Sequence, residues 1–274
     1  MKHRNRSNQA SRKYHDRVAR QYDAIYDDPY WEFHDRLTWE AIKPLLPRDA
    51  TASCCDLGCG TGKWGLKILK SGFPTTFVDH SAAMIEKTRQ KLADQAARAR
   101  KATLLVADIV ELTEIAPEQF SLIVAMGDPL SICSDPLRAA REMFRISKPG
   151  GNVLATADNK LAAIDHFMQK GDLDALQAFL KTGRTRWLTA AEEEQFELTT
   201  FTPSQLRNLF ERAGFEVVKV TGKTILPIRT HKELLAREGG FDRLLELEAE
   251  LSQDSTAAAR AGHLQVHARK PLAR

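Results

Sequence analysis

The stretch CCDLGCGTGKWG, Cys54–Gly65, decides the fold, because it places four glycines directly after a short apolar run. Gly60, Gly62 and Gly65 match G-x-G-x-x-G, the fingerprint of a loop that cradles phosphates between a strand and a helix. Counted from Asp56, the same stretch is D-x-G-x-G-x-G, with a carboxylate where the strand turns into the glycines. Either pattern predicts a strand, a tight loop that approaches a ligand closely, and a helix.

The carboxylate of Asp56 separates two classes of ligand. A helix N-terminus attracts a pyrophosphate, but a carboxylate at the mouth of the same loop would repel it. A ligand that carries an ammonium, a sulfonium and an adenosine would gain from this carboxylate. S-adenosylmethionine is such a ligand, so we expect it here instead of a dinucleotide.

Composition indicates an ordinary globular protein. With 274 residues, 43% of them hydrophobic, the chain can bury one substantial α/β core, and complete disorder is excluded. It contains no run near the roughly 18 consecutive apolar residues of a membrane span, and no apolar segment follows the N-terminal charges, so we expect a cytoplasmic protein that does not enter a membrane. The four cysteines form no C-x-x-C pair, which argues against a disulfide framework or a zinc knot.

The net charge of +4 is unevenly distributed. Residues 1–20 contain seven Lys or Arg and one acid, Asp16, a local charge of +6 that leaves −2 on the remainder. Such an arm could steer nucleic acid or another anion, or be a transit peptide. The simplest interpretation is a solvated, partly disordered leader. No basic face recurs downstream, which argues against nucleic acid as the substrate.

Strand and helix patterns alternate along most of the chain. Short apolar runs that predict strands lie at residues 52–57, 75–79, 103–107, 120–126, 152–157, 215–225 and 265–268. This alternation predicts a parallel sheet with helices on both faces.

The domain organisation follows from where this alternation is interrupted. We expect residues 1–45 to form a basic arm and a tyrosine-rich helical lid, and residues 46–274 to form one α/β domain. Helical insertions are expected at about 160–200 and 228–260. After the first insertion, Thr202 and Pro203 open a helix that Gly214 ends.

One carboxylate follows each of the first four strands. In an open α/β sheet, ligands bind at the carboxyl ends of the strands. A single aspartate there often only caps the next helix. Four in succession predict a ligand with a cation, ribose hydroxyls and an exocyclic amine. They are Asp56, Asp79, Asp108 and Asp128.

These motifs together resemble the class I S-adenosylmethionine-dependent methyltransferase superfamily. The resemblance rests on D-L-G-C-G-T-G, on V-D-H-S-x-x-M-I at 78–85, on A-D at 107–108 and on R-I-S-K-P-G-G at 145–151. It covers residues 20–157 well and the last two strands more loosely. It implies a Rossmann-like seven-stranded sheet of order 3-2-1-4-5-7-6, with strand 7 antiparallel.

The resemblance also implies residue roles. Asp79 would bind the ribose hydroxyls, Asp108 and the backbone of Ile109 the adenine edge, and Met84 would pack on the adenine. Gly58 and Gly60 would let the chain pass beneath the methionyl part. The full predicted cofactor set is Asp56, Gly58, Cys59, Gly60, Asp79, His80, Met84, Asp108, Ile109 and Met126.

All four tyrosines lie within residues 14–30. Tyr22, Tyr26 and Tyr30 are spaced i, i+4, i+8, which puts them on one helical face unless Asp28 and Pro29 break the helix. They are either a core stripe or, as the resemblance suggests, a lid. In a lid their rings would face the sulfonium, each cation–π contact contributing about 0.5–2 kcal/mol.

The sequence says less about the type of reaction than about the class of ligand. A sulfonium is a good leaving group, so methyl transfer needs little beyond a positioned acceptor. Candidate catalytic residues are Asp128, Tyr26, Tyr22 and Asn159. No acceptor motif of the N-P-P-Y type follows strand 4, where the sequence is M-G-D-P-L-S-I. No metal is expected, because the eight histidines are dispersed and a packing or surface role is expected for His263 and His267.

Three functions therefore remain open. The first is methyl transfer to a small-molecule acceptor. The region of Asp128, residues 158–159, the tyrosine-rich lid and the segment A-D-N-K-L-A-A-I-D at 157–165 bear a weaker resemblance to the azetidine-2-carboxylate synthases. These enzymes cyclise S-adenosylmethionine, their sole substrate, and release methylthioadenosine, which is the second possible function. In that reaction Asp128 could orient the ligand's amine and accept its proton, or merely hold the ammonium. The third is a non-catalytic protein that binds S-adenosylmethionine. The sequence leaves the oligomeric state open.

Overall fold

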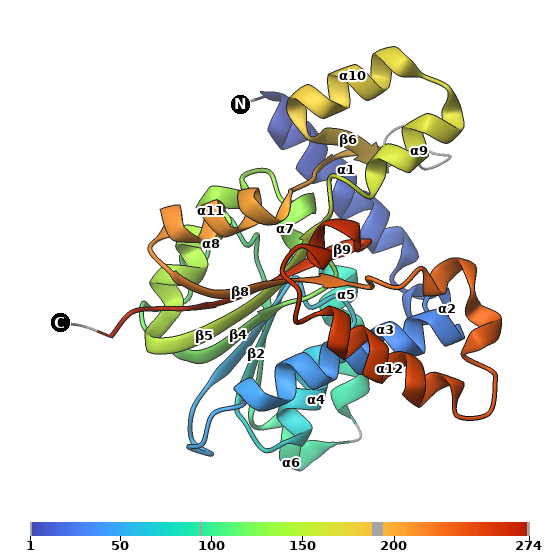
Figure 1. Ribbon diagram of the computed structural model, residues 1–274. Helices are drawn as coiled ribbons and strands as arrows, with labels where there is room; N and C mark the ends of the chain where they lie inside the picture. The colour runs from blue at the N-terminus through green and yellow to red at the C-terminus, as the bar shows by residue number, and fades with distance from the viewer. Residues whose placement is uncertain (1, 94, 188–193, 273–274) are drawn as a thin grey trace.

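The computed structural model describes residues 2–93, 95–187 and 194–272. Within these ranges the main sheet has seven strands in the order β3-β2-β1-β4-β5-β9-β8 (Figure 1). Their bounds are β1 Cys54–Leu57, β2 Thr75–Asp79, β3 Ala102–Val106, β4 Phe120–Ala125, β5 Ser147–Asp158, β8 Glu216–Lys223 and β9 His263–Arg269. Renumbered within the sheet, this is the expected order 3-2-1-4-5-7-6. The antiparallel pairing of β9 with both neighbours is confirmed as well.

Helices cover both faces of the sheet because strand residues alternate between two apolar clusters. Ile123 of β4 packs in the cluster that contains Met143 of α8 (Pro136–Ile146) and Phe210 of α11 (Pro203–Ala213). Its neighbours Leu122 and Val124 pack on the opposite face, with α4 (Lys63–Lys70). This period of two is what a sheet buried on both sides requires.

The capping chemistry of α11 is confirmed. The Thr202 hydroxyl accepts from the Gln205 amide, and the Gln205 side chain accepts from the Thr202 amide, which completes a capping box. Gly214 follows the helix with φ of +107°, a left-handed conformation that glycine adopts without strain.

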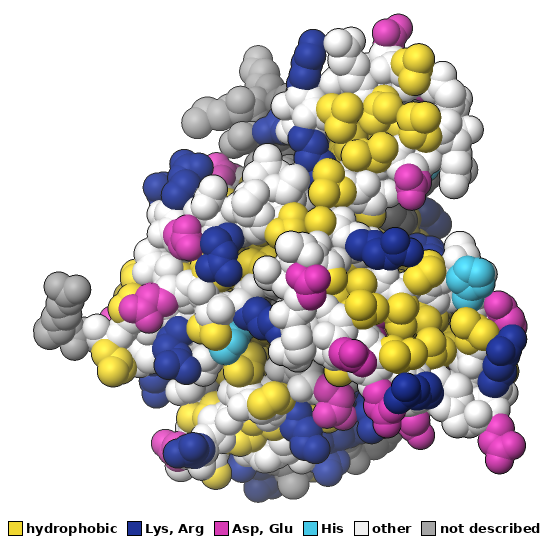
Figure 2. All heavy atoms as spheres, in the orientation of Figure 1, with side chains coloured by type: hydrophobic (Ala, Val, Ile, Leu, Met, Phe, Trp, Pro, Cys, Tyr) yellow, Lys and Arg dark blue, Asp and Glu magenta, His cyan; other side chains and the backbone are white. Residues whose placement is uncertain are grey.

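The first insertion is helical only in its first half. It contains α9 (Ala163–Lys170) and α10 (Leu173–Thr182), then an antiparallel ribbon of β6 (Arg184–Trp187) and β7 (Phe196–Thr199). The expectation of helix through 160–200 is therefore wrong for the ribbon, where R-T-R-W and F-E-L-T alternate with a period of two. Apolar side chains gather on the outer surface of α9 and α10 (Figure 2).

The second insertion lies between β8 and β9. It contains the short turns η3 (Ile228–Thr230), η4 (Lys232–Leu234) and η5 (Ala257–Arg260) and the helix α12 (Gly240–Leu251). Helix α12 lies against α3 (Pro29–Ile42), as Figure 1 shows. At this contact the ring centroids of Phe33 and Phe241 are 5.5 Å apart. This insertion therefore buries an N-terminal helix and fixes it beside the sheet.

The basic arm is not a solvated leader. It forms α1 (Lys2–Val18), which lies against α5 (Ala82–Ala93) and β7. Asp16 accepts a hydrogen bond of 2.5 Å from the Ser81 hydroxyl, and Arg17 pairs with Glu194 at 2.6 Å. The arm is thus held by its polar side chains at the edge where the strands end. None of the described helices is long and apolar enough to cross a bilayer.

The tyrosines do not share one helical face. Tyr22 begins the short helix α2 (Tyr22–Ile25), and α3 begins separately at Pro29. Asp28 caps α3 by accepting from the amides of Tyr30 and Trp31. Because the helix breaks at Asp28, the side chain of Tyr30 packs in a buried apolar cluster that also contains Phe33.

Candidate functional site

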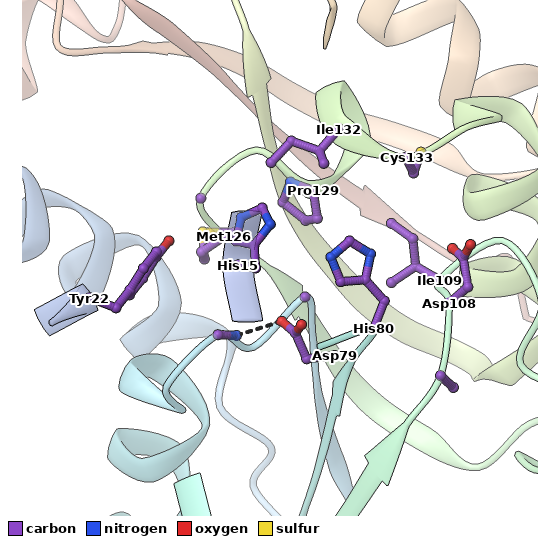
Figure 3. A pocket seen from close by; sticks show the side chains of 14 residues that line it. His15, Tyr22, Asp79, His80, Asp108, Ile109, Met126, Pro129, Ile132 and Cys133 are labelled. Atoms are coloured by element: carbon purple, nitrogen blue, oxygen red, sulfur yellow. Dashed lines mark hydrogen bonds between the residues drawn. The ribbon is translucent and has the colours of Figure 1, made fainter. Parts of the chain in front are cut away.

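A pocket lies at the carboxyl ends of the parallel strands, beneath the N-terminal helices (Figure 3). The space at this site is about 560 Å³, part of which is open to solvent. Eight predicted residues line it: Tyr22, Gly58, Gly60, Asp79, His80, Asp108, Ile109 and Met126. Six more complete the wall: His15, Ala107, Gly127, Pro129, Ile132 and Cys133.

Asp79, at the end of β2, ties the glycine loop to its neighbouring strand. Its Oδ2 accepts from the Gly60 amide at 2.8 Å, the contact drawn in Figure 3, and its Oδ1 accepts from the Ser81 amide at 2.9 Å. The loop passes so close to the β4 end that a Cβ on Gly58 would lie 2.7 Å from Pro129 Cβ. Only glycine fits there, which explains the sequence pattern.

Asp108 lines the pocket on the side opposite Tyr22 (Figure 3). Its Oδ1 accepts from the Val110 amide at 3.1 Å, and its Oδ2 accepts from the Asn8 side chain at 2.5 Å. Asn8 belongs to α1, so the arm reaches the carboxylate that the sequence assigned to the adenine edge. Nothing in the sequence near Asn8 signalled this contact.

The charges of the wall fit a cationic nucleoside. Two carboxylates, Asp79 and Asp108, face the pocket, and none of the lining residues is Lys or Arg. A pyrophosphate would meet no cation here, whereas a sulfonium and an ammonium would meet favourable potential. The residues present therefore fit S-adenosylmethionine.

The arm also contributes His15, which the sequence analysis missed within the basic stretch. Its ring lies 5.5 Å from that of His80 and 6.5 Å from that of Tyr22. Burial, and then the nearby His80, lower the pKa of His15, so this ring is neutral at pH 7. An uncharged His15 does not oppose a cationic ligand.

Tyr22 and Tyr26 pack together above the glycine loop, with ring centroids 5.0 Å apart. Tyr22 lines the pocket and Tyr26 lies behind it. Burial, followed by the neighbouring Tyr26, raises the pKa of Tyr22 well above its ordinary value, so its hydroxyl remains a hydrogen-bond donor.

Three predicted cofactor residues do not line this pocket. Asp56 is fully buried behind the loop, where its Oδ2 accepts from the Gly65 amide at 2.7 Å. It is therefore a support of the loop, and its expected direct contact with a cation is wrong. Met84 packs against Val18 of α1 instead of facing an adenine site. Cys59 turns into the apolar cluster between α4 and α5.

Asp128 belongs to a second group beside the pocket. It follows the lining residue Gly127 with φ of +62°, and its amide donates to Thr156 Oγ1 at 3.0 Å. This turn aims its Oδ2 at His263 Nδ1, 2.7 Å away. The ring N–H does not point straight at the oxygen, so the contact is an ion pair and not a well-aligned hydrogen bond.

Sheet register brings the rest of this group together. His263 on β9 lies directly opposite Asp158 on β5 and Lys223 on β8. Its Nδ1 is 3.8 Å from Asp158 Oδ1. The expected packing or surface role of His263 is thus wrong, because β9 begins where three strand ends meet. The sequence offered no signal for it beyond its position at a strand boundary.

Burial and the neighbouring charges shift the pKa values of the residues in this group. Burial by itself would lower the pKa of His263, but the charge of Asp128 raises it above its ordinary value. Burial favours the neutral form of Asp128, yet the charge of His263 lowers the pKa of that carboxyl. Burial and the charge of Asp128 raise the pKa of Asp158 to about 6. Burial lowers the pKa of Lys223 to about 8.

Asn159 was expected to face the cavity, but its side chain points away from it. Its side-chain amide donates to the carbonyls of Ala258, Ala259 and Ala261, at 3.4, 3.0 and 2.6 Å. The residue is 2% exposed, so it fixes the turn η5 against the end of β5. A catalytic role for Asn159 is therefore replaced by a structural one.

In the described chain, Asp128, Asp158 and His263 form a group whose ligand-type atoms lie within 4.8 Å of one another. A metal ion could use such spacing. Here Asp128 is already paired with His263, and the charge of the buried Lys223, whose Nζ donates to Thr38 Oγ1 at 2.7 Å, also favours the ionised Asp128, so the arrangement is that of an ion cluster.

Known proteins share this architecture. A family model described as a methyltransferase domain matches residues 30–220. Demethylmenaquinone methyltransferase of Staphylococcus aureus (strain JH9) is 28% identical over 213 residues, which are 76% of this chain and 85% of that protein.

Two solved structures illustrate the fold. An S-adenosylmethionine-dependent methyltransferase from Methanosarcina mazei superposes with a TM-score of 0.60 and 20% identity, covering 85% of this chain and 98% of that chain. The (4+2)-cyclase SpnF superposes with a TM-score of 0.55 and 19% identity, covering 87% and 81%. At such identities the likeness is one of fold alone.

Proposed function

This chain belongs to the class I S-adenosylmethionine-dependent methyltransferase superfamily, and from that premise we propose that it is an enzyme that methylates a small organic acceptor. The observation that carries the proposal is the pocket wall, where carboxylates and a glycine loop meet without a Lys or Arg. S-adenosylmethionine bound there supplies an electrophilic methyl group on a positively charged sulfur.

The chain's own residues divide the binding among them. Asp79 stands ready for the ribose hydroxyls, since its two oxygens are fixed by the amides of Gly60 and Ser81. Asp108 and the backbone of Ile109 provide an acceptor and a donor for the adenine edge. Fixed hydrogen-bonding groups favour affinity because little ordering remains to be done on binding.

The paired rings of Tyr22 and Tyr26 close the pocket above the glycine loop. Their role in this proposal is to exclude water, and the ring of Tyr22, which lines the pocket, offers an electron-rich face to the cation, a contact of about 0.5–2 kcal/mol. Both phenols stay protonated at neutral pH because burial raises the pKa of each. Exclusion of water strengthens the electrostatic contacts within the pocket.

The acceptor would approach from the side of Asp128, beyond Gly127. The two insertions flank this side, and Tyr30 and Trp31 of α3 lie beneath Arg229 of η3, with the guanidinium 5.7 and 5.9 Å from their ring centroids. The Staphylococcus aureus relative is named for methylation of demethylmenaquinone, a small organic molecule. We extend to this chain only that class of acceptor.

One observation favours the cyclisation of S-adenosylmethionine to azetidine-2-carboxylate as a second candidate. That reaction needs a group that receives the proton of an attacking amine, and the carboxylates of Asp128 and Asp158 lie beside the pocket with His263 between them. The two reactions differ in the nucleoside they release.

The deciding experiment is to incubate the pure protein with S-adenosylmethionine, with and without a reduced demethylmenaquinone analogue, and to identify the product by mass spectrometry. Methyl transfer predicts S-adenosylhomocysteine that depends on an acceptor. Methylthioadenosine formed without any acceptor would replace the first candidate by the second. Binding measured by calorimetry with no nucleoside released in either arm would exclude the cyclisation and this acceptor, and would favour a non-catalytic binder.

A further inference from the structure

We propose that Asp158 takes the proton that a neutral hydroxyl acceptor loses on methylation, and that His263 and Asp128 hold it in position for this task. This inference rests on the proposed methyltransferase function. It assigns a catalytic role to a residue that the pocket itself does not include.

The geometry singles out Asp158 within its cluster. Its side chain is 31% exposed, compared with 14% for Asp128 and 19% for His263, so it is the member most open to an incoming molecule. Its backbone amide donates to Ser131 Oγ at 2.8 Å, which fixes the end of β5. Asp128 Oδ2 is turned toward His263 and paired with it, and Asp128 Oδ1 is buried.

Proton affinity supports the same choice. A general base works best when its pKa lies near the working pH. The pKa of Asp158, raised to about 6 by burial and by Asp128, meets this condition. The lowered pKa of Asp128 makes it a poor proton acceptor, and the pKa of His263, which the charge of Asp128 raises against the effect of burial, favours the protonated ring.

The groups around Asp158 balance in charge. Asp128 and Asp158 are negative, while His263 and Lys223 are positive. Burial and then the charge of Lys223 lower the pKa of His34 to about 3, so that ring, 5.8 Å from His263, is neutral. Asp35, on α3, is paired with Lys63 at 2.7 Å.

A balanced cluster penalises a charged acceptor, because its charge would be desolvated without a counter-charge. It accommodates a neutral one. Aromatic rings pack in a row beside the cluster, since successive ring centroids from Tyr26 to Trp31, from Trp31 to His34 and from His34 to His263 are 4.8, 5.1 and 5.8 Å apart. The structure therefore favours a neutral, aromatic alcohol or phenol.

The step balances as follows. A lone pair of the acceptor oxygen forms the new bond to the methyl carbon. The carbon–sulfur bond breaks and leaves its electron pair on sulfur. The oxygen–hydrogen bond then breaks, and its proton passes to a carboxylate oxygen of Asp158. The positive charge that entered on sulfur leaves as this proton, which returns to solvent through the exposed edge of Asp158.

The test uses three probes of one shape, 4-methylphenol, 4-methylbenzoate and 4-methylbenzylamine, each with methyl-labelled S-adenosylmethionine and detection by mass spectrometry. Methylation of the phenol is expected to exceed that of the other two by at least 10-fold. Asp158→Asn is expected to lower kcat about 100-fold or more with KM changed less than 3-fold, and to abolish the fall of kcat below pH 6. Asp158→Glu should recover part of the activity. Asp165→Asn, on the exposed surface of α9, is the matched control and should leave every value unchanged.

A second measurement needs no acceptor. The carboxyl carbon of Asp158, observed by NMR in protein labelled with carbon-13 aspartate, should titrate near pH 6. In Asp128→Asn its pKa should fall, since a neighbouring negative charge is removed. A normal pKa in the wild-type protein would overturn the proposal even if Asp158→Asn failed to fold.

Other results would also overturn it. These are preferential methylation of the benzoate or the amine, no methylation of any probe by a protein that binds S-adenosylmethionine, equal activity of Asp158→Asn, or loss of activity with EDTA that Mg²⁺ restores. Such results leave the proposed function standing wherever S-adenosylhomocysteine is still released. A protein that neither binds S-adenosylmethionine nor releases a nucleoside would remove both.

Discussion

The side-chain amide of Asn8 donates a 2.5 Å hydrogen bond to Asp108 Oδ2, which joins the N-terminal helix to a carboxylate 100 positions away. An adenine amine that uses Asp108 must share this oxygen with Asn8 or displace it. We therefore expect Asn8→Ala to tighten binding of S-adenosylmethionine about 2- to 5-fold, the equivalent of losing one modest hydrogen bond of about 0.5–1 kcal/mol. Calorimetry measures this, with Gln9→Ala, an exposed change on the same helix, as the control. Weaker binding in Asn8→Ala would show that Asn8 helps to hold the ligand.

Asp79→Ala should weaken cofactor binding about 10- to 100-fold. The change removes a carboxylate whose hydrogen bonding to the ribose is expected to contribute about 1.5–3 kcal/mol in total, and it frees the Gly60 amide. Calorimetry with S-adenosylhomocysteine gives the affinity, and thermal unfolding shows whether the fold survives. Asp174→Ala, exposed on α10, provides the comparison. An unchanged affinity in Asp79→Ala would refute the ribose assignment.

Tyr26→Phe should lower turnover about 5- to 20-fold while reducing the free energy of unfolding by less than about 1 kcal/mol. The Tyr26 hydroxyl shares a hydrogen bond with Tyr22, which lines the pocket. Removing this hydroxyl should therefore loosen the pocket wall more than the hydrophobic core. Steady-state kinetics and urea unfolding are measured on the same preparation. Tyr14→Phe, on α1 outside the pocket wall, should leave turnover unchanged. A variant that loses stability but keeps its turnover would show that Tyr26 is a core residue without a role in the reaction.

Asp56 makes stability depend on pH. Burial raises its pKa to about 7 in the folded chain, compared with about 4 when unfolded. The folded state therefore keeps a proton that the unfolded state loses, and stability falls as pH rises from about 4 to about 7, by up to about 1.4 kcal/mol per pH unit.

Asp56→Asn removes this titration. As the pH rises from about 4 to about 7, the unfolding free energy of the wild type should therefore fall relative to that of the variant. Urea unfolding at pH 5, 6, 7 and 8 measures it. Parallel pH profiles of the two proteins would contradict the buried titration.

Gly65→Ala should destabilise the protein by about 1–3 kcal/mol, the usual cost of overpacking. An added Cβ would lie 2.3 Å from Phe77 Cε1 and 2.9 Å from Asp56 Oδ2, so both the core and the loop support would shift. Gly262→Ala is the matched control, since no atom lies within 4 Å of its added Cβ. Thermal unfolding should show a change only for Gly65→Ala. Similar melting of both variants would mean that the loop tolerates displacement.

The sequence by itself determined the sheet, the glycine loop and the acids that follow its strands. The features that specify them are local: the alternation of apolar residues within each strand, the glycines needed for close approach, and the Thr202 cap. Asp79, Asp108 and Gly60 could be placed at the pocket because the carboxyl ends of parallel strands share one edge of a sheet. The class of ligand followed from charge at that edge.

Only the tertiary structure decided which side chains meet. His263 joins Asp128 and Asp158 because the antiparallel return of β9 sets it opposite β5, a register that no local pattern encodes. Asn8 and His15 enter the site because α1 docks across the strand ends, through contacts with residues far along the chain. Asp56 and Asn159 look like ligands in the sequence, yet backbone groups that become their neighbours only on folding turn them inward. Local sequence fixes which residues reach the edge of the sheet, whereas the packing of distant segments fixes where their side chains point.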